Sequence, residues 1–324
     1  MTEVEWPKIG NEQAVKFLTG ALQNDKVAQS YVFVGPDDLG KSTIALSFAR
    51  HLQGALEGFN SDLHILQPLA DQKNITIEAV RGFIKILNLS SFSNSYKIGI
   101  IKEADCLSEE AKSALLKTLE EPKDKVVIIL LVSDDNNLPA TILSRSQVLY
   151  FYPVAAAVIY DYLIDNQGAS RSLAKDLANL SIGRPFLALR LLEHPDDYQA
   201  YLKMASLWLS LISVEVSERL AILDQIFKDR TWSKAARDLA AKIIAMAEGL
   251  ARDLLLLNFA ENDRVQHLAI SADLEKALNY LNESSDQDPL PLILQQLKLA
   301  AQAREYLAGN INPRLVLEQL ALNY

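Results

Sequence analysis

Short apolar runs alternate with helical periodicity through the first part of the chain. Four runs bounded by polar or turn-forming residues predict buried strands at 31–34, 97–101, 126–132 and 147–151. Apolar residues recur at helical spacing between them, in 42–52, 78–87 and 109–119. Because strands alternate with helices, the pattern predicts an α/β domain with a parallel sheet and helices on both faces.

The strand pattern stops after Pro153. Residues 155–192 predict a small helical unit that is broken at Gly168 and at 183–185. Residues 196–288 contain no proline and only one glycine, Gly249, which favours an all-helical domain. A polar hinge at 282–288 and two last helices, 290–307 and 313–322, complete the predicted elements.

A phosphate-binding loop follows the first predicted strand. It reads Gly35, Pro36, Asp37, Asp38, Leu39, Gly40, Lys41, Ser42, and Thr43 follows it in the next helix. The segment fits G-x-x-x-x-G-K-[ST] at every fixed position and lies between a strand and a helix. Its glycines let backbone N–H groups face phosphate oxygens, Lys41 supplies a positive charge, and Ser42 would hold magnesium.

The acidic partner of such a loop is altered. It is expected at the end of a neighbouring strand, where Lys102, Glu103 and Asp105 follow the run 97–101. Lys102 stands where a carboxylate would hold magnesium, and an ammonium there repels the metal. Glu103 stands where a water-activating carboxylate is expected, and Asp105 is an alternative metal ligand. The sequence therefore leaves ATP or ADP binding open but disfavours magnesium binding and hydrolysis.

Two later segments carry the most specific pattern. Residues 114–122 read Ala-Leu-Leu-Lys-Thr-Leu-Glu-Glu-Pro, and residues 138–147 read Leu-Pro-Ala-Thr-Ile-Leu-Ser-Arg-Ser-Gln. Together they resemble the bacterial clamp-loader branch of AAA+ proteins, although Ser146 stands where that family has cysteine. In the family, the arginine matching Arg145 projects toward the ATP of a neighbouring subunit, where it would stabilise charge in the transition state. The alternative is a surface arginine that its own loop caps.

The resemblance extends over most of the chain. Residues 9–13 resemble the family's segment beside adenine, which implies a nucleotide contact for Ile9. Residues 183–192 and 310–318 resemble the ends of its lid and collar. The resemblance implies three domains: an AAA+ P-loop domain (1–152), a helical lid (153–197) and an all-helical collar for oligomerisation (198–324).

The departures suggest which role the chain has in such a family. The lid arginine that senses phosphate would fall near Phe186, although Arg184 lies only two residues away and leaves the register open. Lys102 replaces the metal ligand, whereas Arg145 is kept. This combination implies a stator that serves a neighbour's ATPase site within a hetero-oligomeric ring, which loads a sliding clamp onto primed DNA. One alternative is an active ATPase subunit that uses Glu103 or Asp105. Another is a scaffold whose loop no longer binds nucleotide.

Composition narrows the remaining chemistry. The single cysteine, Cys106, excludes an internal disulfide and a cysteine zinc site, including the four-cysteine module that the family carries near 52–69. The four histidines are widely separated and predict no metal site. A formal net charge of −9 makes DNA contact local or delegated to a partner. No apolar run is long enough to span a membrane, and no signal peptide is visible, so we expect a cytoplasmic protein.

Overall fold

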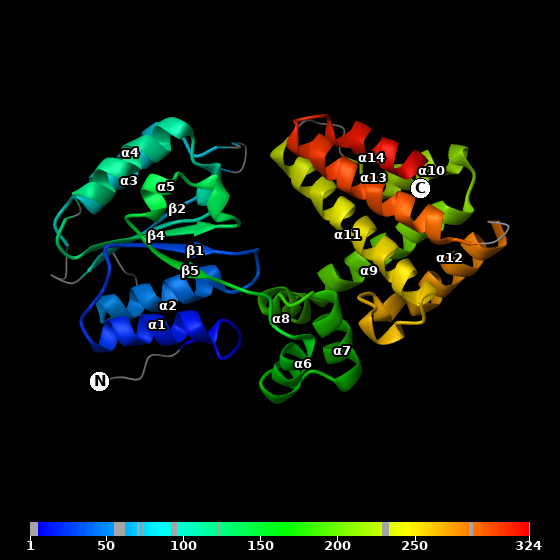
Figure 1. The fold of residues 1–324 in the computed structure, drawn as a ribbon, viewed down its shortest axis with the longest axis horizontal. Helices are drawn as coiled ribbons and strands as arrows, with labels where there is room; N and C mark the ends of the chain where they lie inside the picture. Colours follow the sequence, from blue (N-terminus) through cyan, green and yellow to red (C-terminus); the bar gives the residue numbers. More distant parts are fainter. Residues whose placement is uncertain are drawn as a thin grey trace. The chain divides into compact units, whose positions relative to one another are not determined.

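The computed structural model describes residues 6–54, 62–69, 72, 74–91, 96–121, 123–228, 233–284 and 288–323. Internal packing divides the chain into two units (Figure 1). One contains residues 1–159 and 183–187, and the other contains 160–182 and 188–324. The division into three domains at 152 and 197 stays a prediction, and each unit is described on its own.

A five-stranded parallel sheet forms the centre of the first unit, in the order β2-β3-β4-β1-β5. Its strands are β1 (Ser30–Val34), β2 (Leu63–Leu66), β3 (Lys97–Ile101), β4 (Val126–Val132) and β5 (Gln147–Tyr150). Its helices are α1 (Glu12–Gln23), α2 (Lys41–Gln53), α3 (Ile77–Leu87), α4 (Glu109–Glu120) and the short α5 (Ala140–Leu143). The predicted α/β class is confirmed.

Helices cover both faces of this sheet. Alternate residues of β4 enter two different apolar cores, because successive side chains of a strand point to opposite faces. One core contains α3 and α4, and the other contains α1 and α2 (Figure 1). The predicted apolar positions of α2, among them Ile44 and Phe48, are fully buried in the second core.

The prediction of four strands was wrong by one, because it missed β2. This edge strand is only four residues long, and none of its side chains is fully buried. A short, half-exposed segment containing His64 carries too little apolar pattern to be recognised. Pro122, the predicted stop of α4, lies outside the described residues, as does part of the predicted hinge at 282–288.

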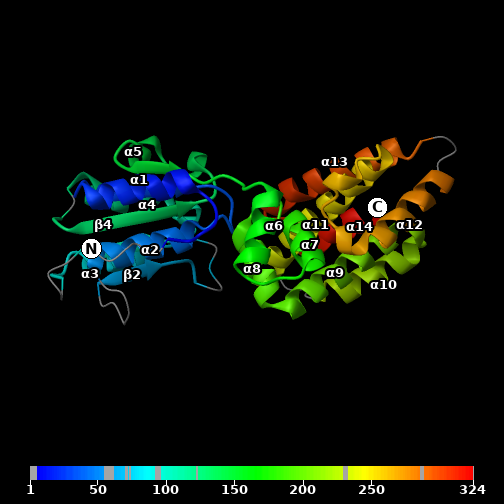
Figure 2. The same ribbon diagram turned by 90° about the horizontal axis from the view of Figure 1, so that it is seen from below.

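The second unit is helical. Three short helices follow β5: α6 (Ala156–Asp165), α7 (Arg171–Leu180) and α8 (Pro185–Glu193), of which α7 belongs wholly to the second unit. The larger helices are α9 (Pro195–Ser210), α10 (Val216–Ile226), α11 (Lys234–Asn258), α12 (Ser271–Ser284), α13 (Leu290–Ala308) and α14 (Pro313–Leu322). The long α11 packs along α13 (Figures 1 and 2). As predicted, Asn312 caps α14, because its side chain accepts a hydrogen bond from the Arg314 amide.

A buried polar cluster lies within the core of the helical unit. Asp253 and His267 are fully buried in side chain, and Asp253 Oδ2 lies 2.7 Å from His267 Nδ1. The backbone amides of Gln266 and His267 also donate to Asp253, at 2.9 and 2.8 Å. Gln266 Nε2 in turn donates to the carbonyl of Leu180 at the end of α7. The cluster therefore joins α7 to α11 through the segment that contains Gln266.

In the part of the chain that the structure describes, no helix is both long and apolar enough to cross a membrane.

Candidate phosphate loop and interface arginine

The loop 35–42 connects the carboxyl end of β1 to the N-terminus of α2. Gly35 and Gly40 have φ angles of 147° and 96°, which strongly favour glycine. Gly40 is the N-cap of α2 and, because it has no side chain, makes no side-chain cap hydrogen bond to the first turn. Ser42 is partly buried and Thr43 exposed in this turn. Uncapped N–H groups at a helix start, together with a glycine turn, are the groups that bind phosphate.

Lys41 points into its own loop. Its side chain is only 7% exposed, and its ammonium donates to the carbonyls of Gly35 and Pro36. Asp37 Oδ1 lies 3.5 Å from the same nitrogen. Burial lowers the pKa of Lys41, and the nearby negative charge of Asp37 partly opposes that shift.

Two further segments hold the loop. The side chain of Asn11 donates to the carbonyl of Leu39 at 2.9 Å and accepts from the amide of Tyr152 at 2.8 Å. Ile9, the predicted adenine contact, comes two residues before Asn11 in the sequence and is buried. Its role in nucleotide binding stays a prediction. The amide of Phe186 donates to the carbonyl of Asp38 at 3.1 Å.

Phe186, near which the sequence places the missing phosphate-sensing arginine, lies against the loop. Its ring packs so closely over Gly40 that a side chain at that glycine would clash with it. An aromatic ring offers no positive charge to a phosphate. The contact explains why position 40 needs glycine, and it places an apolar group beside the loop.

Glu103 and Asp105 are the acidic side chains predicted to act beside the loop. Glu103 is exposed, in a left-handed turn with φ of 50°. The carboxylate of Asp105 accepts hydrogen bonds from the Ser133 amide, at 3.0 Å for Oδ2, and from Asn137 Nδ2 at 3.0 Å. Among the described residues there is no group of three or more side chains arranged to hold a metal. The loop offers a glycine turn, a helix N-terminus and a lysine, which are groups that bind phosphate, and magnesium binding beside it stays an open prediction.

Arg145 lies in the turn between α5 and β5. Its guanidinium donates through Nη1 to the carbonyl of Thr141 at 3.2 Å, and Nη2 lies 3.0 Å from Oε1 of Glu120. Ser146, the replacement for the family cysteine, donates to the carbonyl of Ile142 and lies 2.7 Å from the hydroxyl of Ser30. These contacts fix the turn against β1, while 38% of the Arg145 side chain stays exposed.

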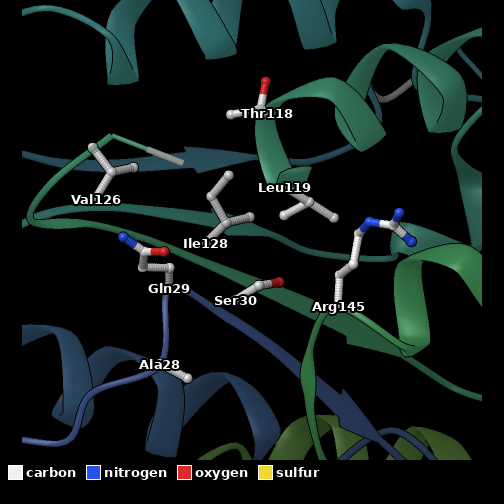
Figure 3. A pocket seen from close by; sticks show the side chains of 8 residues that line it. All are labelled: Ala28, Gln29, Ser30, Thr118, Leu119, Val126, Ile128 and Arg145. Atoms are coloured by element: carbon white, nitrogen blue, oxygen red, sulfur yellow. The ribbon is translucent and has the colours of Figure 1, made fainter. Parts of the chain in front are cut away.

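A pocket of about 110 Å³ opens beside Arg145 (Figure 3). Its lining residues come from the start of β1 and the segment before it, from β4, from the end of α4 and from the turn before β5: Ala28, Gln29, Ser30, Thr118, Leu119, Val126, Ile128 and Arg145. In Figure 3, Arg145 rises from its turn toward the side of the pocket on which Leu119 lies.

The phosphate loop and Arg145 lie at opposite edges of the sheet. Gln147 in β5 pairs with Tyr31 in β1, so Arg145 lies before the first paired residues, whereas Gly35 follows the last. Six residues of strand separate the two levels, which corresponds to roughly 20 Å at a rise of ~3.3 Å per residue. An arginine side chain cannot span that distance, so Arg145 cannot act on a phosphate in its own loop.

The sequence thus located the loop and Arg145, but it missed the contact between Arg145 and Glu120. The one signal that could have found it is a carboxylate at the C-terminal end of a helix, where negative charge is locally unfavourable.

The fold and the loop define an AAA+ P-loop protein with an all-helical C-terminal unit. A gamma subunit-related protein of DNA polymerase III from Thermotoga maritima has a similar structure, with a TM-score of 0.50 and 18% identity over 81% of this chain and 99% of that one. At this identity the likeness concerns the fold alone.

The sequence comparisons are more specific. A family model described as DNA polymerase III, delta subunit, matches residues 10–155. The DNA polymerase III subunit delta′ of Bacillus subtilis is 26% identical over 340 residues, covering 98% of each chain. The delta′ subunit of Haemophilus influenzae is 32% identical over 41% of this chain and 40% of its own length. DNA polymerase III subunit tau of B. subtilis is 29% identical over 47% of this chain and 29% of its own length. Over 98% of its length, the chain is therefore similar to a delta′ subunit of bacterial DNA polymerase III.

Proposed function

We propose that this protein is a delta′-like stator of a bacterial clamp loader, and that it presents Arg145 to the nucleotide of a neighbouring ATPase subunit. The relatives support the broader statement, a clamp-loader subunit of DNA polymerase III. The proposed partners are the ATPase and clamp-opening subunits of a hetero-oligomeric ring. Through that ring the protein would contribute to loading a sliding clamp onto primed DNA.

The observation that carries the proposal is the position of Arg145 at the sheet edge opposite its own loop. Because the arginine cannot reach its own loop, any nucleotide it serves must belong to another subunit. A guanidinium brought to the γ-phosphate would neutralise charge that develops as the bond to the leaving ADP breaks. Its 38% exposure leaves the side chain accessible to such a partner.

The altered acidic site supports a stator more than an ATPase. Lys102 stands where a magnesium carboxylate is expected, and Asp105 is engaged by Ser133 and Asn137. A nucleotide in this chain's own loop would be held through its phosphates by the backbone of 35–42 and by Lys41 after that side chain turns outward. A bound nucleotide would add negative charge that the N–H groups at the start of α2 can offset. We propose that the loop binds ATP or ADP without hydrolysing it efficiently.

The test replaces Arg145 with Ala in a complex reconstituted with its ATPase and clamp-opening subunits. We expect normal assembly by size-exclusion chromatography and a fall of at least about tenfold in turnover at the one ATP site that faces this subunit. Arg50→Ala is a matched control, because Arg50 is an exposed arginine at the far end of α2. Turnover at the wild-type level in an assembled Arg145→Ala complex would refute the trans-acting role.

A further inference from the structure

The two ends of α4 carry the same kind of charge for different reasons. Ser108 caps its N-terminus by accepting from the Ala111 amide, and acidic residues follow in the first turn, where the helix dipole favours them. Acidic residues also occur at the other end, where Glu120 is the last helical residue and Glu121 follows. Negative charge at a helix C-terminus is unfavourable, so local helix stability does not account for these two residues.

Glu120 has a specific partner. Its Oε1 lies 3.0 Å from Nη2 of Arg145, while Nη1 of the same guanidinium donates to the carbonyl of Thr141. The arginine is thereby folded back between the end of α4 and the end of α5. In Figure 3, Arg145 accordingly extends toward the side on which Leu119, the residue before Glu120, is found.

We infer that Glu120 is a positioning residue that retracts Arg145 and competes with a neighbour's phosphate for it. The inference rests on the proposed trans-acting role of Arg145. The N–H groups on one edge of a guanidinium suit a single carboxylate or phosphate, so Nη2 exchanges Glu120 for phosphate when the arginine engages. Glu120 therefore opposes engagement until a neighbouring subunit brings its nucleotide close.

The exposure of the pair sets the size of the effect. The Arg145 and Glu120 side chains are 38% and 49% exposed, so water and salt screen their attraction. Ion pairs this exposed change a population by a factor of about two to five. Glu120 consequently biases the arginine toward the retracted position without locking it there.

The experiment measures ATP turnover by the reconstituted complex in the absence of clamp and primed DNA. Glu120→Gln keeps the shape of the side chain and removes its charge, and we expect turnover to rise about two- to fivefold. Glu121→Gln is the matched control, because it removes the same charge from the same helix end. Glu120→Asp, which keeps the charge, is expected to restore turnover toward the wild-type level. In an Arg145→Ala background, Glu120→Gln should have no effect.

The outcomes separate this inference from the proposal beneath it. If Arg145→Ala leaves turnover unchanged, the trans-acting role itself fails. If Arg145→Ala lowers turnover but Glu120→Gln matches Glu121→Gln or lowers turnover, the retraction by Glu120 is refuted and the role of Arg145 stands. A rise that persists in the Arg145→Ala background also refutes it, because the effect then does not pass through the arginine.

Discussion

Replacing Asp253 with Ala removes the central acceptor of the polar cluster in the helical unit. The carboxylate is fully buried and accepts three hydrogen bonds, from the amides of Gln266 and His267 and from His267 Nδ1. The substitution leaves these three donors buried without their acceptor. A typical hydrogen bond contributes about 1 kcal/mol and one to a charged group more, so we expect a loss of about 3–5 kcal/mol in unfolding free energy.

Guanidinium unfolding of the full chain measures this loss. The indole of Trp208 is fully buried in the same core, so its fluorescence reports on the helical unit. Replacing Trp6 and Trp232 with Phe in every variant leaves Trp208 as the single indole. The midpoint should fall with an unchanged slope.

Asp273→Ala is the matched control for the same chemical change on the surface. Among the described residues, Asp273 forms an ion pair with the exposed Lys276, at 3.5 Å. Because that pair is exposed, replacing Asp273 should lower the unfolding free energy by less than about 1 kcal/mol. An Asp253→Ala variant that loses no more stability than this control would contradict the assignment of the cluster as a structural support.

Two other predictions concern the first unit. Lys97→Met should lower the unfolding free energy of this unit by about 3–5 kcal/mol in urea unfolding. The substitution leaves the buried Asp62 carboxylate without the ammonium that lies 3.6 Å away, and a loss below about 1 kcal/mol would refute this role of Lys97. If the loop binds nucleotide through its phosphates without magnesium, as we propose, millimolar ATP or ADP should raise the melting temperature both with and without a magnesium chelator. Lys41→Ala should abolish the rise, whereas a wild-type melting temperature that nucleotide does not change would favour a purely structural loop.

The sequence predicted the parts of the fold that depend on local pattern. Val126–Val132 is apolar throughout and became the fully buried β4. The loop 35–42 was recognisable because its glycines, lysine and serine occupy fixed positions between a strand and a helix. The helical spacing of apolar residues in 42–52 likewise predicted α2, in which Ile44 and Phe48 are fully buried.

Contacts between distant segments could not be predicted in this way. Lys97 begins β3 and reads as an exposed strand end, yet it is 3% exposed and donates to the carbonyls of Ile86 and Leu89. Asp253 likewise reads as a polar position on an amphipathic helix. Both side chains are buried because a partner from another segment offsets the cost of removing their charge from water, and that partner is not visible in local sequence.

Arg145 and the phosphate loop are held by separate sets of contacts, and this separation explains how a chain could lose hydrolysis and still serve a neighbour. Arg145 is positioned by Thr141, Glu120 and the Ser30–Ser146 contact, all at the amino edge of the sheet. The residues that would bind and activate a nucleotide follow the carboxyl ends of β1 and β3, where Lys102 stands. None of the groups that hold Arg145 belongs to the loop, so replacement of the metal ligand leaves the arginine in place. Under the proposed function, a subunit that keeps Arg145 at one edge of the sheet but lacks the metal ligand at the other can complete its neighbour's site without hydrolysing ATP itself.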